Sequence, residues 1–464
     1  MNTKKTAYFS AHRIIGSSLG KIYESYAEED EQGRPWETVK QSLVKILNHC
    51  KQNVPYYSAF IREMDDSYQQ EPELYLQRLP VLTKEIIRAN FAHLASRDLS
   101  HRKWAYNTSG GSTGEPIKLI QDRAYTDRQM AVQMLSFDWA GRAFGEPAVR
   151  VWGSERDVLQ GSAGLKMKML NYLTNDQYLN AFRMTPVNMR AFINELNARR
   201  PQLIIAYAQA IYELAKFAER EAISVVPQVA ILTSAGTLHR FMREKIEAVF
   251  QCKVYDRYGS REVGDIASEC NAHAGLHVFP WTNYVEVVDD DGQPVPNGVV
   301  GNILITSLIN FAMPLIRYAI GDRGVLCASD CACGRRGQML QKVLGKSVDA
   351  FRAADGTLVD GEYFTHLLYF KEWVHKFQVI QKERSLVVFR IAPAGLSYRL
   401  QELDEIAEKT KVVMGTVCKI KFEFMDDIPP SATGKYRYTI SEVDEGPSWQ
   451  STRRSPGAAG MPSV

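Results

Sequence analysis

Between residues 202 and 258, short apolar runs of strand length alternate with helical patterns. The segments are strand, helix, strand, helix and strand, at residues 202–208, 211–221, 229–233, 238–250 and 254–258. Strands that alternate with helices of about 10–15 residues are typical of βαβ units, whose parallel strands form an open sheet covered on both faces. The sequence therefore predicts an α/β fold in this region.

Other parts of the chain carry different patterns. Residues 1–105 are predicted to be mostly helical, with apolar positions three and four apart, as in 36–50. After about residue 280, two strand-like segments flank the turn-rich stretch at 289–301, which indicates antiparallel strands. Residues 377–424 are predicted to contain a strand pair, a helix and a further strand, enough for a core of their own. A small α+β unit should therefore follow the large α/β portion.

The charge balance and the apolar pattern exclude several classes of protein. The 464 residues include 56 Lys and Arg against 53 Asp and Glu, a net charge of +3. This surplus is too small for a protein built around sequence-independent nucleic-acid binding. No apolar run approaches the roughly 18–20 residues of a membrane span, and the N-terminus lacks the apolar stretch of a secretory signal. We therefore expect a cytoplasmic protein without nucleic-acid or membrane partners, and homodimer formation stays open.

The segment YNTSGGSTGEPIK, at residues 106–118, combines glycines and hydroxyl side chains around a turn. Glycine lets backbone amides approach an anion closely, and Ser and Thr add donors, which suits a cradle for a triphosphate. The segment is not a Walker A loop, because it lacks the G-x-x-x-x-G-K-[ST] pattern. A flexible Gly/Ser turn is the alternative, but the Thr-Gly-x-Pro core and Lys118 favour phosphate binding.

Three later segments complete a set of four motifs. They are YGSRE at residues 258–262, PLIRYAIGD at 314–322 and ATGKYR at 432–437. In order and spacing the four resemble the motifs of the adenylate-forming superfamily of acyl-CoA ligases and peptide-synthetase adenylation domains. Residues 35–440 are similar to its branch of phenylacetate–CoA ligases, capsular-polysaccharide CapK proteins and coenzyme F390 synthetases. Each motif alone could be an ordinary turn, whereas four in register point to this family.

The resemblance implies a domain organisation and a reaction. It implies a large N-terminal adenylate-forming domain at residues 1–347, with mixed sheets flanked by helices and a small β subdomain. A small mobile α+β cap domain would follow at 348–445, and residues 446–464, rich in Gly, Pro and Ser, are expected to be disordered. In this family a carboxylate attacks the α-phosphate of ATP to give an acyl-adenylate and pyrophosphate. A second nucleophile, commonly the thiol of CoA, then displaces AMP.

The resemblance assigns the β and γ phosphates to a loop that comprises Ser109, Gly110, Gly111, Ser112, Thr113 and Gly114. Glu262 corresponds to the residue that helps to hold Mg²⁺, a hard ion that prefers carboxylate oxygens. Tyr258, with Gly259 beside it, corresponds to the aromatic residue that lies against adenine. Thr113 and Glu262 are counted among the expected catalytic residues.

Further positions match nucleotide contacts and catalysis. Asp322 corresponds to the carboxylate that accepts from the ribose hydroxyls, a role suited to an acceptor-only group. The tripeptide Ser234, Ala235 and Gly236 follows a predicted strand, where open α/β sheets bind ligands. Lys435 corresponds to the cap-domain lysine that reaches the substrate carboxylate and the α-phosphate. Its charge would stabilise the negative charge that develops during adenylation.

The hinge region departs from the family pattern. This branch usually has Gly-Arg-x-Asp-Asp, whereas residues 345–349 are GKSVD. Lys346 stands where an Arg would contact ribose or phosphate, and it keeps the charge without the planar guanidinium. Val348 occupies the first Asp position, so Asp349 is the only acid left. The residue that acts as the hinge therefore stays open.

Seven cysteines in a chain without a predicted signal do not suggest a disulfide framework. Three thiolates and one imidazole make a closed tetrahedral zinc set, and branch members with a Cys-x-Cys-Gly turn resemble this arrangement. The set that we predict is Cys270, His277, Cys331 and Cys333. His277, in the Gly-Leu-His tripeptide that recurs in the branch, is preferred to His273. Cys327 competes as a ligand, and free thiols in a reducing cytosol are the alternative.

The sequence thus predicts a ligase that activates a carboxylic acid with ATP and Mg²⁺, transfers it to CoA and contains structural Zn²⁺. An aromatic acid is preferred, and the acid pocket is expected between residues 120–240 and the nucleotide loops. Its candidate walls, which are more often core residues, are Trp139, Trp152, Tyr207 and Tyr212. One alternative passes the acyl group to a carrier protein, an amine or a sugar hydroxyl in a polysaccharide or natural-product pathway. Another is a catalytically silent, zinc-stabilised binding protein of the same fold, against which the intact motifs argue.

Overall fold

A computed structural model describes most of the chain. The described ranges are 3–32, 35–63, 65–109, 117–152, 171–180, 186–346, 351–356, 358–359, 361–369, 371, 373–394, 400–429 and 437–443. Gly110 to Gly114 of the phosphate loop, Lys435 and the predicted tail lie outside these ranges, and of Lys346 only the backbone is described. Within the described part, no helix is long and apolar enough to cross a membrane.

The first part of the chain is mostly helical, as the spacing of its apolar residues predicts. The helices are α1 (Thr3–Ile14), α2 (Leu19–Gln32), α3 (Pro35–Asn53), α4 (Pro55–Glu63), η1 (Ser67–Gln69), α5 (Pro72–Gln77), α6 (Lys84–Ala89), α7 (Phe91–Leu94) and η2 (Leu99–His101). At the start of α6, the Thr83 hydroxyl accepts a hydrogen bond from the Ile86 amide at 3.3 Å. Such a cap satisfies an amide that has no partner within the helix, so it fixes where α6 begins.

A two-stranded hairpin carries the glycine-rich segment. Strands β1 (Trp104–Thr108) and β2 (Lys118–Asp122) pair antiparallel, with Thr108 opposite Lys118, so the residues between them connect the two strands. Asp122 ends β2 and also caps α8 (Arg123–Trp139), because its side chain accepts from the Tyr125 amide at 2.8 Å. The hairpin and α8 are thereby joined without a flexible linker.

In the described residues, eleven strands form one large sheet in the order β10-β11-β12-β13-β9-β8-β7-β6-β5-β3-β4. The parallel strands are β3 (Ala148–Trp152), β4 (Asp176–Asn180), β5 (Leu203–Tyr207), β6 (Ala230–Ser234) and β7 (Lys253–Ser260). The antiparallel strands are β8 (Gly264–Glu269), β9 (Leu276–Val278), β10 (Asn283–Val288), β11 (Gly301–Ser307), β12 (Tyr318–Leu326) and β13 (Met339–Lys346). The sheet therefore has a parallel end and an antiparallel end, and strand β7 belongs to both, since it pairs parallel with β6 and antiparallel with β8.

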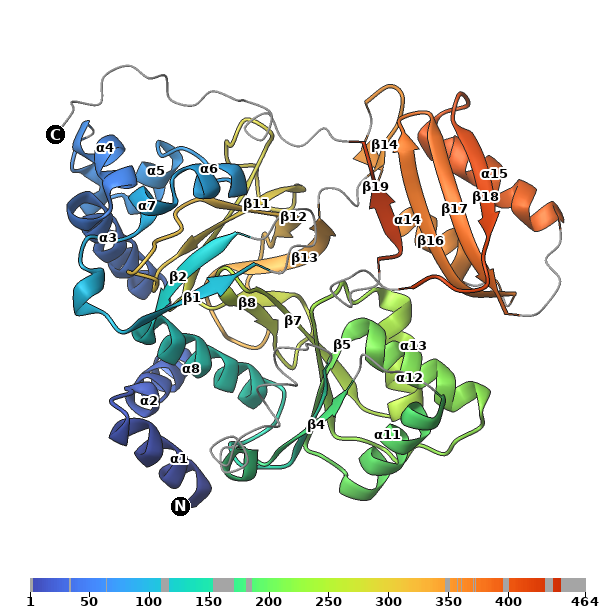
Figure 1. Ribbon diagram of the computed structural model, residues 1–464, viewed down its shortest axis with the longest axis horizontal. Helices are drawn as coiled ribbons and strands as arrows, with labels where there is room; N and C mark the ends of the chain where they lie inside the picture. Colours follow the sequence, from blue (N-terminus) through green and yellow to red (C-terminus); the bar gives the residue numbers. More distant parts are fainter. Residues whose placement is uncertain are drawn as a thin grey trace.

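Helices α11 (Pro186–Arg199), α12 (Ala208–Arg220) and α13 (Arg240–Phe250) cover one face of the parallel end (Figure 1). Side chains alternate between the two faces of a strand, so Val149 and Val151 of β3 pack with these helices. Ala148, on the opposite face, packs with Phe137 of α8. The predicted α/β alternation is confirmed, and its central parallel strands, β3, β5 and β6, are buried on both faces.

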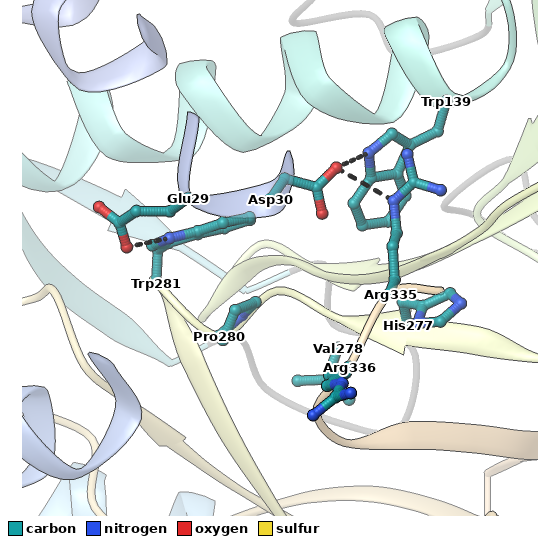
Figure 2. A pocket seen from close by; sticks show the side chains of 9 residues that line it. All are labelled: Glu29, Asp30, Trp139, His277, Val278, Pro280, Trp281, Arg335 and Arg336. Atoms are coloured by element: carbon teal, nitrogen blue, oxygen red, sulfur yellow. Dashed lines mark hydrogen bonds and ion pairs between the residues drawn. The ribbon is translucent and has the colours of Figure 1, made fainter. Parts of the chain in front are cut away.

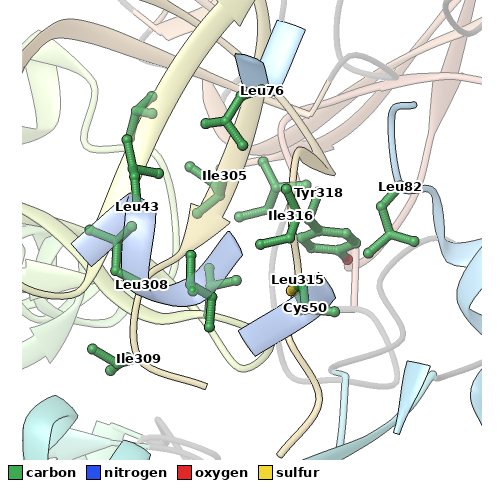
Figure 3. Close-up of a cluster of buried hydrophobic side chains, with 14 of the residues drawn as sticks. Leu43, Cys50, Leu76, Leu82, Ile305, Leu308, Ile309, Leu315, Ile316 and Tyr318 are labelled. Atoms are coloured by element: carbon green, nitrogen blue, oxygen red, sulfur yellow. The ribbon is translucent and has the colours of Figure 1, made fainter. Parts of the chain in front are cut away.

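The antiparallel end shares a core with the N-terminal helices. Figure 3 shows Leu43 and Cys50 of α3 lying over Ile305 and Tyr318 of the sheet. All four side chains are at most 1% exposed, so helices from the first 60 residues are packed directly against strands from beyond residue 300. This contact brings the segment before α6 to the start of β12.

A smaller α+β unit follows the large sheet and has its own core. Its elements are β14 (Phe351–Arg352), β15 (Leu358–Val359), α14 (Glu362–Tyr369), β16 (Val374–Glu383), β17 (Leu386–Pro393), α15 (Leu400–Met414), β18 (Lys419–Phe424) and β19 (Thr439–Ser441). Four strands form a sheet in the order β18-β17-β16-β19, against which α14 and α15 pack through a buried cluster that includes Phe364, Phe389 and Ile406. In Figure 1 this unit is drawn in orange and red at the upper right, above α12 and α13.

Candidate active site and metal centre

Two motifs that are distant in sequence meet near the end of β7. The Tyr258 hydroxyl donates a hydrogen bond to Asp322 Oδ2 at 2.7 Å, and the Tyr318 hydroxyl donates to Glu262 Oε1 at 3.3 Å. Burial, and then the carboxylate that each phenol faces, raises the pKa of Tyr258 and of Tyr318 well above the usual range. Both phenols therefore stay protonated and orient the carboxylates of Asp322 and Glu262.

A lysine that the motifs do not include lies at the same place. Lys84 Nζ is 3.8 Å from Glu262 Oε1, and the two side chains are only 19% and 8% exposed. Lys84 is the first residue of α6, directly after the capping residue Thr83. The backbone of Leu82 exchanges hydrogen bonds of 3.0 and 2.9 Å with the chain at the start of β12. The motif LTKE predicts the helix start, but only the tertiary packing brings its ammonium group to Glu262.

The base of the phosphate loop is held closed by Ser109. Its amide donates to the carbonyl of Ile117 at 3.0 Å, and its hydroxyl accepts from the Ile117 amide at 2.9 Å. The hydroxyl is buried and keeps one proton to donate. Lys118, expected to favour phosphate binding, places Nζ 3.5 Å from the ring centroid of Tyr106, a cation–π contact. In the described conformation this ammonium group is engaged by the hairpin's own aromatic residue.

Polar side chains of the hairpin hold the YGSRE motif. Asn107 Nδ2 donates to the carbonyl of Arg261 at 3.3 Å, and Gln121 Nε2 donates to the carbonyls of Arg261 and Glu262 at 3.2 and 3.4 Å. The two strands that flank the phosphate loop are thus bonded to the backbone that carries Glu262. The hairpin strands and the segment that carries Glu262 are therefore held together.

The tripeptide at residues 234–236 occupies the carboxyl end of β6. Ser234 is the last residue of the strand, and Ala235 has φ of +61°, a left-handed conformation that is uncommon for a residue with a side chain. A Cβ on Gly236 would meet nothing within 4 Å. At Gly259, by contrast, a Cβ would lie 2.8 Å from the carbonyl oxygen of Gly264. The close approach of β7 and β8 therefore accounts for glycine at position 259, whereas position 236 has open space beside it.

The described backbone also places Lys346 near the ribose candidate. Lys346 ends β13, and its backbone lies opposite that of Asp322 in the antiparallel pairing of β12 with β13. The chain therefore leaves the large sheet beside the residue that is expected to bind ribose. Val348 and Asp349 of the departing hinge sequence lie outside the described residues.

Arg317, which stands within the PLIRYAIGD motif, is a structural residue. It is 3% exposed, and its Nε donates to Glu286 Oε1 at 3.1 Å. Its two terminal nitrogens donate to the carbonyls of Leu79 and Gly292 at 2.8 and 2.7 Å. The guanidinium thus binds the N-terminal segment to the antiparallel sheet and is occupied by protein groups.

The four aromatic candidates for the acid pocket separate into different environments. Trp152 and Tyr207 lie at the carboxyl ends of β3 and β5, with ring centroids 4.2 Å apart. Tyr212 of α12 is buried in the core between the helices and the parallel strands, and Trp139 of α8 packs in a separate core with α1 and α2. Only the Trp152–Tyr207 pair, among the four, stands at the sheet edge where an open α/β sheet binds ligands.

The predicted metal ligands converge. The ligand atoms of Cys270, His277, Cys331 and Cys333 all lie within 4.8 Å of one another. The Sγ atoms of Cys270 and Cys331 are 3.7 Å apart, and Cys333 Sγ is 3.4 Å from His277 Nε2. A tetrahedral ion with bonds of about 2.3 Å to sulfur and about 2.0 Å to nitrogen separates its ligand atoms by about 3.5–3.8 Å. The donor set and its spacing therefore fit Zn²⁺.

Protonation at the group also suits a metal. Burial, and then the Arg335 guanidinium, lowers the pKa of His277 to about 4, so its imidazole is neutral near pH 7. Neutral imidazole is the form that ligates zinc. His273, the alternative ligand, instead places Nδ1 3.3 Å from Glu269 Oε2, and Cys327 packs beside the group without belonging to it.

A small pocket beside the metal group is lined by residues of α2, α8 and the turn that carries Arg335. Figure 2 shows Asp30 of α2 beside Trp139 and Arg335: its Oδ2 accepts from Trp139 Nε1 and from Arg335 Nε, both at 3.0 Å. The Arg335 guanidinium also lies 4.5 Å from the Trp139 ring, and its backbone amide donates to Cys333 Sγ at 3.4 Å. The Cys-x-Cys turn is thereby fastened to α2 and α8.

Comparison with known proteins agrees with this geometry. Residues 351–442 match the family model of the CapK C-terminal domain. The chain is 22% identical over 445 residues to protein CapK of Staphylococcus aureus, covering 93% of this chain and 96% of that protein. It is 29% identical over 224 residues to phenylacetate-coenzyme A ligase of Thermus thermophilus, covering 43% of this chain and 50% of that protein.

A solved structure shows the same fold. It is 2-hydroxyisobutyryl-CoA ligase in the postadenylation state, in complex with 2-HIB-AMP, and it matches with a TM-score of 0.68 at 18% identity over 90% of each chain. The four motifs, the matched C-terminal unit and these similarities agree with one another. Residues 351–442 form a CapK C-terminal domain, and the chain is similar to CapK and to phenylacetate-coenzyme A ligases and shares the fold of 2-hydroxyisobutyryl-CoA ligase.

Proposed function

We propose that the chain activates a carboxylic acid with ATP to give an acyl-adenylate and pyrophosphate, and then transfers the acyl group to CoA. The observation that carries the proposal is the convergence of Tyr258, Glu262 and Asp322 from two distant motifs. Relatives that are phenylacetate-coenzyme A ligases, and a structural neighbour that is an acyl-CoA ligase, support the reaction class. The acid itself is proposed to be aromatic.

In the first half-reaction, a carboxylate oxygen of the acid attacks the α-phosphorus of ATP. A new O–P bond forms while the bond to the bridging oxygen breaks, and pyrophosphate leaves with the electron pair. Negative charge spreads over the phosphate oxygens, so the site needs cations and donors rather than a covalent nucleophile. Lys84 would supply one cation beside Glu262, and Lys435 would supply the other at the α-phosphate. Asp322, oriented by Tyr258, would accept from the ribose hydroxyls.

In the second half-reaction, the thiolate of CoA attacks the acyl carbon, and AMP leaves with the electrons of the acyl–oxygen bond. The division of the chain at residues 347 and 348, and a rotation of the C-terminal unit between the two steps, form part of this proposal. Lys435 should act in the first half-reaction only. The main alternative acceptors, a carrier-protein thiol, an amine or a sugar hydroxyl, would use the same adenylate.

Glu262 fits the expected Mg²⁺, because its buried carboxylate offers a hard oxygen donor. Oε1 accepts from the Tyr318 hydroxyl at 3.3 Å and lies 3.8 Å from the Lys84 ammonium, which is beyond hydrogen-bond distance. The two carboxylate oxygens together offer about four acceptor positions, so acceptor positions remain for an ion. When bound, the ion would neutralise charge on the β and γ phosphates.

The test is acid-dependent exchange of labelled pyrophosphate into ATP. A panel of phenylacetate, benzoate, 2-hydroxyisobutyrate and short-chain acids should contain at least one that supports exchange, and Lys435→Ala should abolish it. Lys421→Ala, which removes an exposed lysine on β18, is the matched control and should exchange as the parent does. Absence of exchange with every acid, together with absence of ATP binding by calorimetry, would support a silent binding protein instead. Addition of CoA and detection of AMP and a thioester by mass spectrometry distinguishes CoA from the other acceptors.

We also propose that Cys270, His277, Cys331 and Cys333 hold a structural zinc ion. The support is the closed set of four protein donors, which leaves no position for a substrate or an activated water. Its role would be to join the β8–β9 turn to the turn after β12, and through Arg335 to α2. Elemental analysis of protein purified without chelator should give close to one zinc per chain, and a value near zero would exclude the site.

A further inference from the structure

Tyr438 is fixed in the C-terminal unit immediately before β19. Its carbonyl accepts from the Val379 amide of β16 at 2.7 Å, and its ring centroid lies 4.9 Å from that of Phe377. The carbonyl of the preceding residue, Arg437, accepts from Gln378 Nε2 at 3.1 Å. The ring of Tyr438 therefore moves with the C-terminal sheet.

The same ring contacts the large portion of the chain. Its centroid is 6.2 Å from that of His239 and 6.4 Å from that of Phe241, with interplanar angles of 81° and 85°. His239 and Phe241 stack on one another, 5.4 Å apart and 4° from parallel, at the start of α13. Edge-on contacts of this kind are the favoured geometry of aromatic pairs. We call His239, Phe241 and Tyr438 the aromatic clamp.

The start of β16 lies near α12. His375, the second residue of β16, has an exposed side chain, and partial desolvation followed by the charge of Lys216 on α12 lowers its pKa. Figure 1 shows β16 and β19 facing α12 and α13. The contact between the C-terminal unit and α13 is the aromatic clamp itself, and the start of β16 lies within electrostatic reach of α12.

The clamp joins the unit whose sequence contains Lys435 to the helix that follows residues 234–236. Resting on the proposed function, we propose that the clamp sets the orientation of the C-terminal unit that is used for adenylation. Tyr438 is then a positioning residue for the first half-reaction, acting through Lys435.

The clamp suits an arrangement that must also open. An aromatic edge that contacts two stacked rings is directional, so this contact favours one orientation of the C-terminal unit. The three clamp residues do not include a pair of opposite charges, so opening the contact does not require separating an ion pair. The second half-reaction starts from the finished adenylate and does not use Lys435. Loss of the ring should therefore slow adenylation and leave transfer from the adenylate to CoA unaffected.

The functional test separates the two half-reactions in Tyr438→Ala. With an acid from the panel that supports exchange, pyrophosphate exchange should fall about tenfold, while thioester formation from supplied acyl-adenylate and CoA stays within twofold of the parent. Tyr438→Phe should restore exchange, because the ring makes the contacts. Phe424→Ala, which removes a partly exposed ring from β18, controls for aromatic loss in the same unit. Equal losses in both half-reactions would indicate a merely structural role and overturn the proposal.

A second test does not depend on any acid. The charges of Lys216 on α12 and Lys376 on β16 both lower the pKa of His375, so an amine-reactive cross-linker should join these two lysines in the full-length parent and in Tyr438→Phe. The cross-linked peptide, quantified by mass spectrometry, should decrease several-fold in Tyr438→Ala but not in Phe424→Ala. An unchanged cross-link in Tyr438→Ala would overturn the clamp. If no acid supports exchange in the parent, the proposed function fails, whereas this measurement still decides whether the clamp exists.

Discussion

The hydroxyl of Tyr258 lies 2.7 Å from the carboxylate of Asp322, although 64 positions separate the two residues in the chain. Their strands, β7 and β12, are separated in the sheet by β8, β9 and β13. In a flat sheet, strands four places apart would lie about 19 Å from one another, since neighbours are about 4.8 Å apart. The antiparallel end must therefore curl strongly, and the curl brings the expected adenine and ribose contacts together.

Tyr258→Phe should weaken ATP binding about fivefold. The phenol orients Asp322, and loss of one hydrogen bond costs about 1 kcal/mol, whereas the ring that is proposed to face adenine is kept. Asp322→Asn should have a larger effect, because it removes the charge as well. Titration calorimetry with ATP measures both variants. Tyr363→Phe, whose hydroxyl donates to the Lys409 carbonyl in the C-terminal unit, should bind ATP as the parent does. Parent-like affinity in both site variants would argue against this ribose contact.

Lys84→Ala should reduce the rate of pyrophosphate exchange by about 10- to 100-fold, because a cation beside developing phosphate charge is worth about 1.4–2.8 kcal/mol in a partly buried site. Lys84→Arg should retain part of the rate. Steady-state exchange at saturating ATP measures the effect. Lys245→Ala, which removes a surface lysine paired with Glu219, is the matched control. An unaltered rate in Lys84→Ala would restrict Lys84 to a structural role.

Cys331→Ser should lower the zinc content well below one ion per chain and reduce the melting temperature by several degrees, since a closed site contributes its binding energy to folding. Elemental analysis and thermal denaturation measure the two quantities. Cys418→Ser, which alters a buried thiol of the C-terminal unit, should leave the zinc content unchanged. The same melting temperature with and without chelator in the parent would show that no structural ion is present.

Asp138 should make stability depend on pH. Burial raises its pKa to about 6, above the value of 3.8 expected when unfolded, although a 2.6 Å hydrogen bond from Tyr23 opposes the shift. The folded state therefore holds this proton more tightly, and its contribution to stability is complete below about pH 4 and lost as the pH rises through 6. Asp138→Asn, which mimics the protonated form, should increase the free energy of unfolding by about 1–2 kcal/mol at pH 8.

This gain should disappear near pH 4, where the parent is protonated too. Urea denaturation at pH 4, 6 and 8 measures the difference between the two proteins. Asp65→Asn, at an exposed position on the surface, provides the comparison. A gain of equal size at all three pH values would show that removal of the carboxylate acts through packing rather than through the proton.

Patterns local in sequence predicted much of the fold. The alternation at residues 202–258 predicted β5 to β7 with the intervening helices, and Thr83 predicted the start of α6. Spacing within a short segment suffices for such elements, because the hydrogen bonds and apolar faces involved are local. The four motifs likewise pointed to the positions of Tyr258, Glu262 and Asp322.

Relationships that depend on packing between distant segments could not be predicted from patterns. Nothing in the sequence around Lys84 indicates that its ammonium lies 3.8 Å from Glu262, because that distance results from α3 and α6 packing against the antiparallel sheet. Asp30 resembles any acid on an exposed helix until Arg335 and Trp139 are brought to it. His277 and His273 differ by four positions, and only the course of β9 decides which imidazole faces the thiols.

Strand β7 is shared by the parallel and the antiparallel ends of the sheet. Its direct neighbour β6 ends in Ser234, so β6 and β7 both end at expected nucleotide contacts, whereas β5 and β3, farther along the sheet, end in Tyr207 and Trp152. A close-packed sheet resists deformation. We therefore expect a new acid to be accommodated through residues at the ends of β3 and β5 while the nucleotide contacts keep their positions. Such a division would let related chains diverge in substrate while retaining one way of making the adenylate.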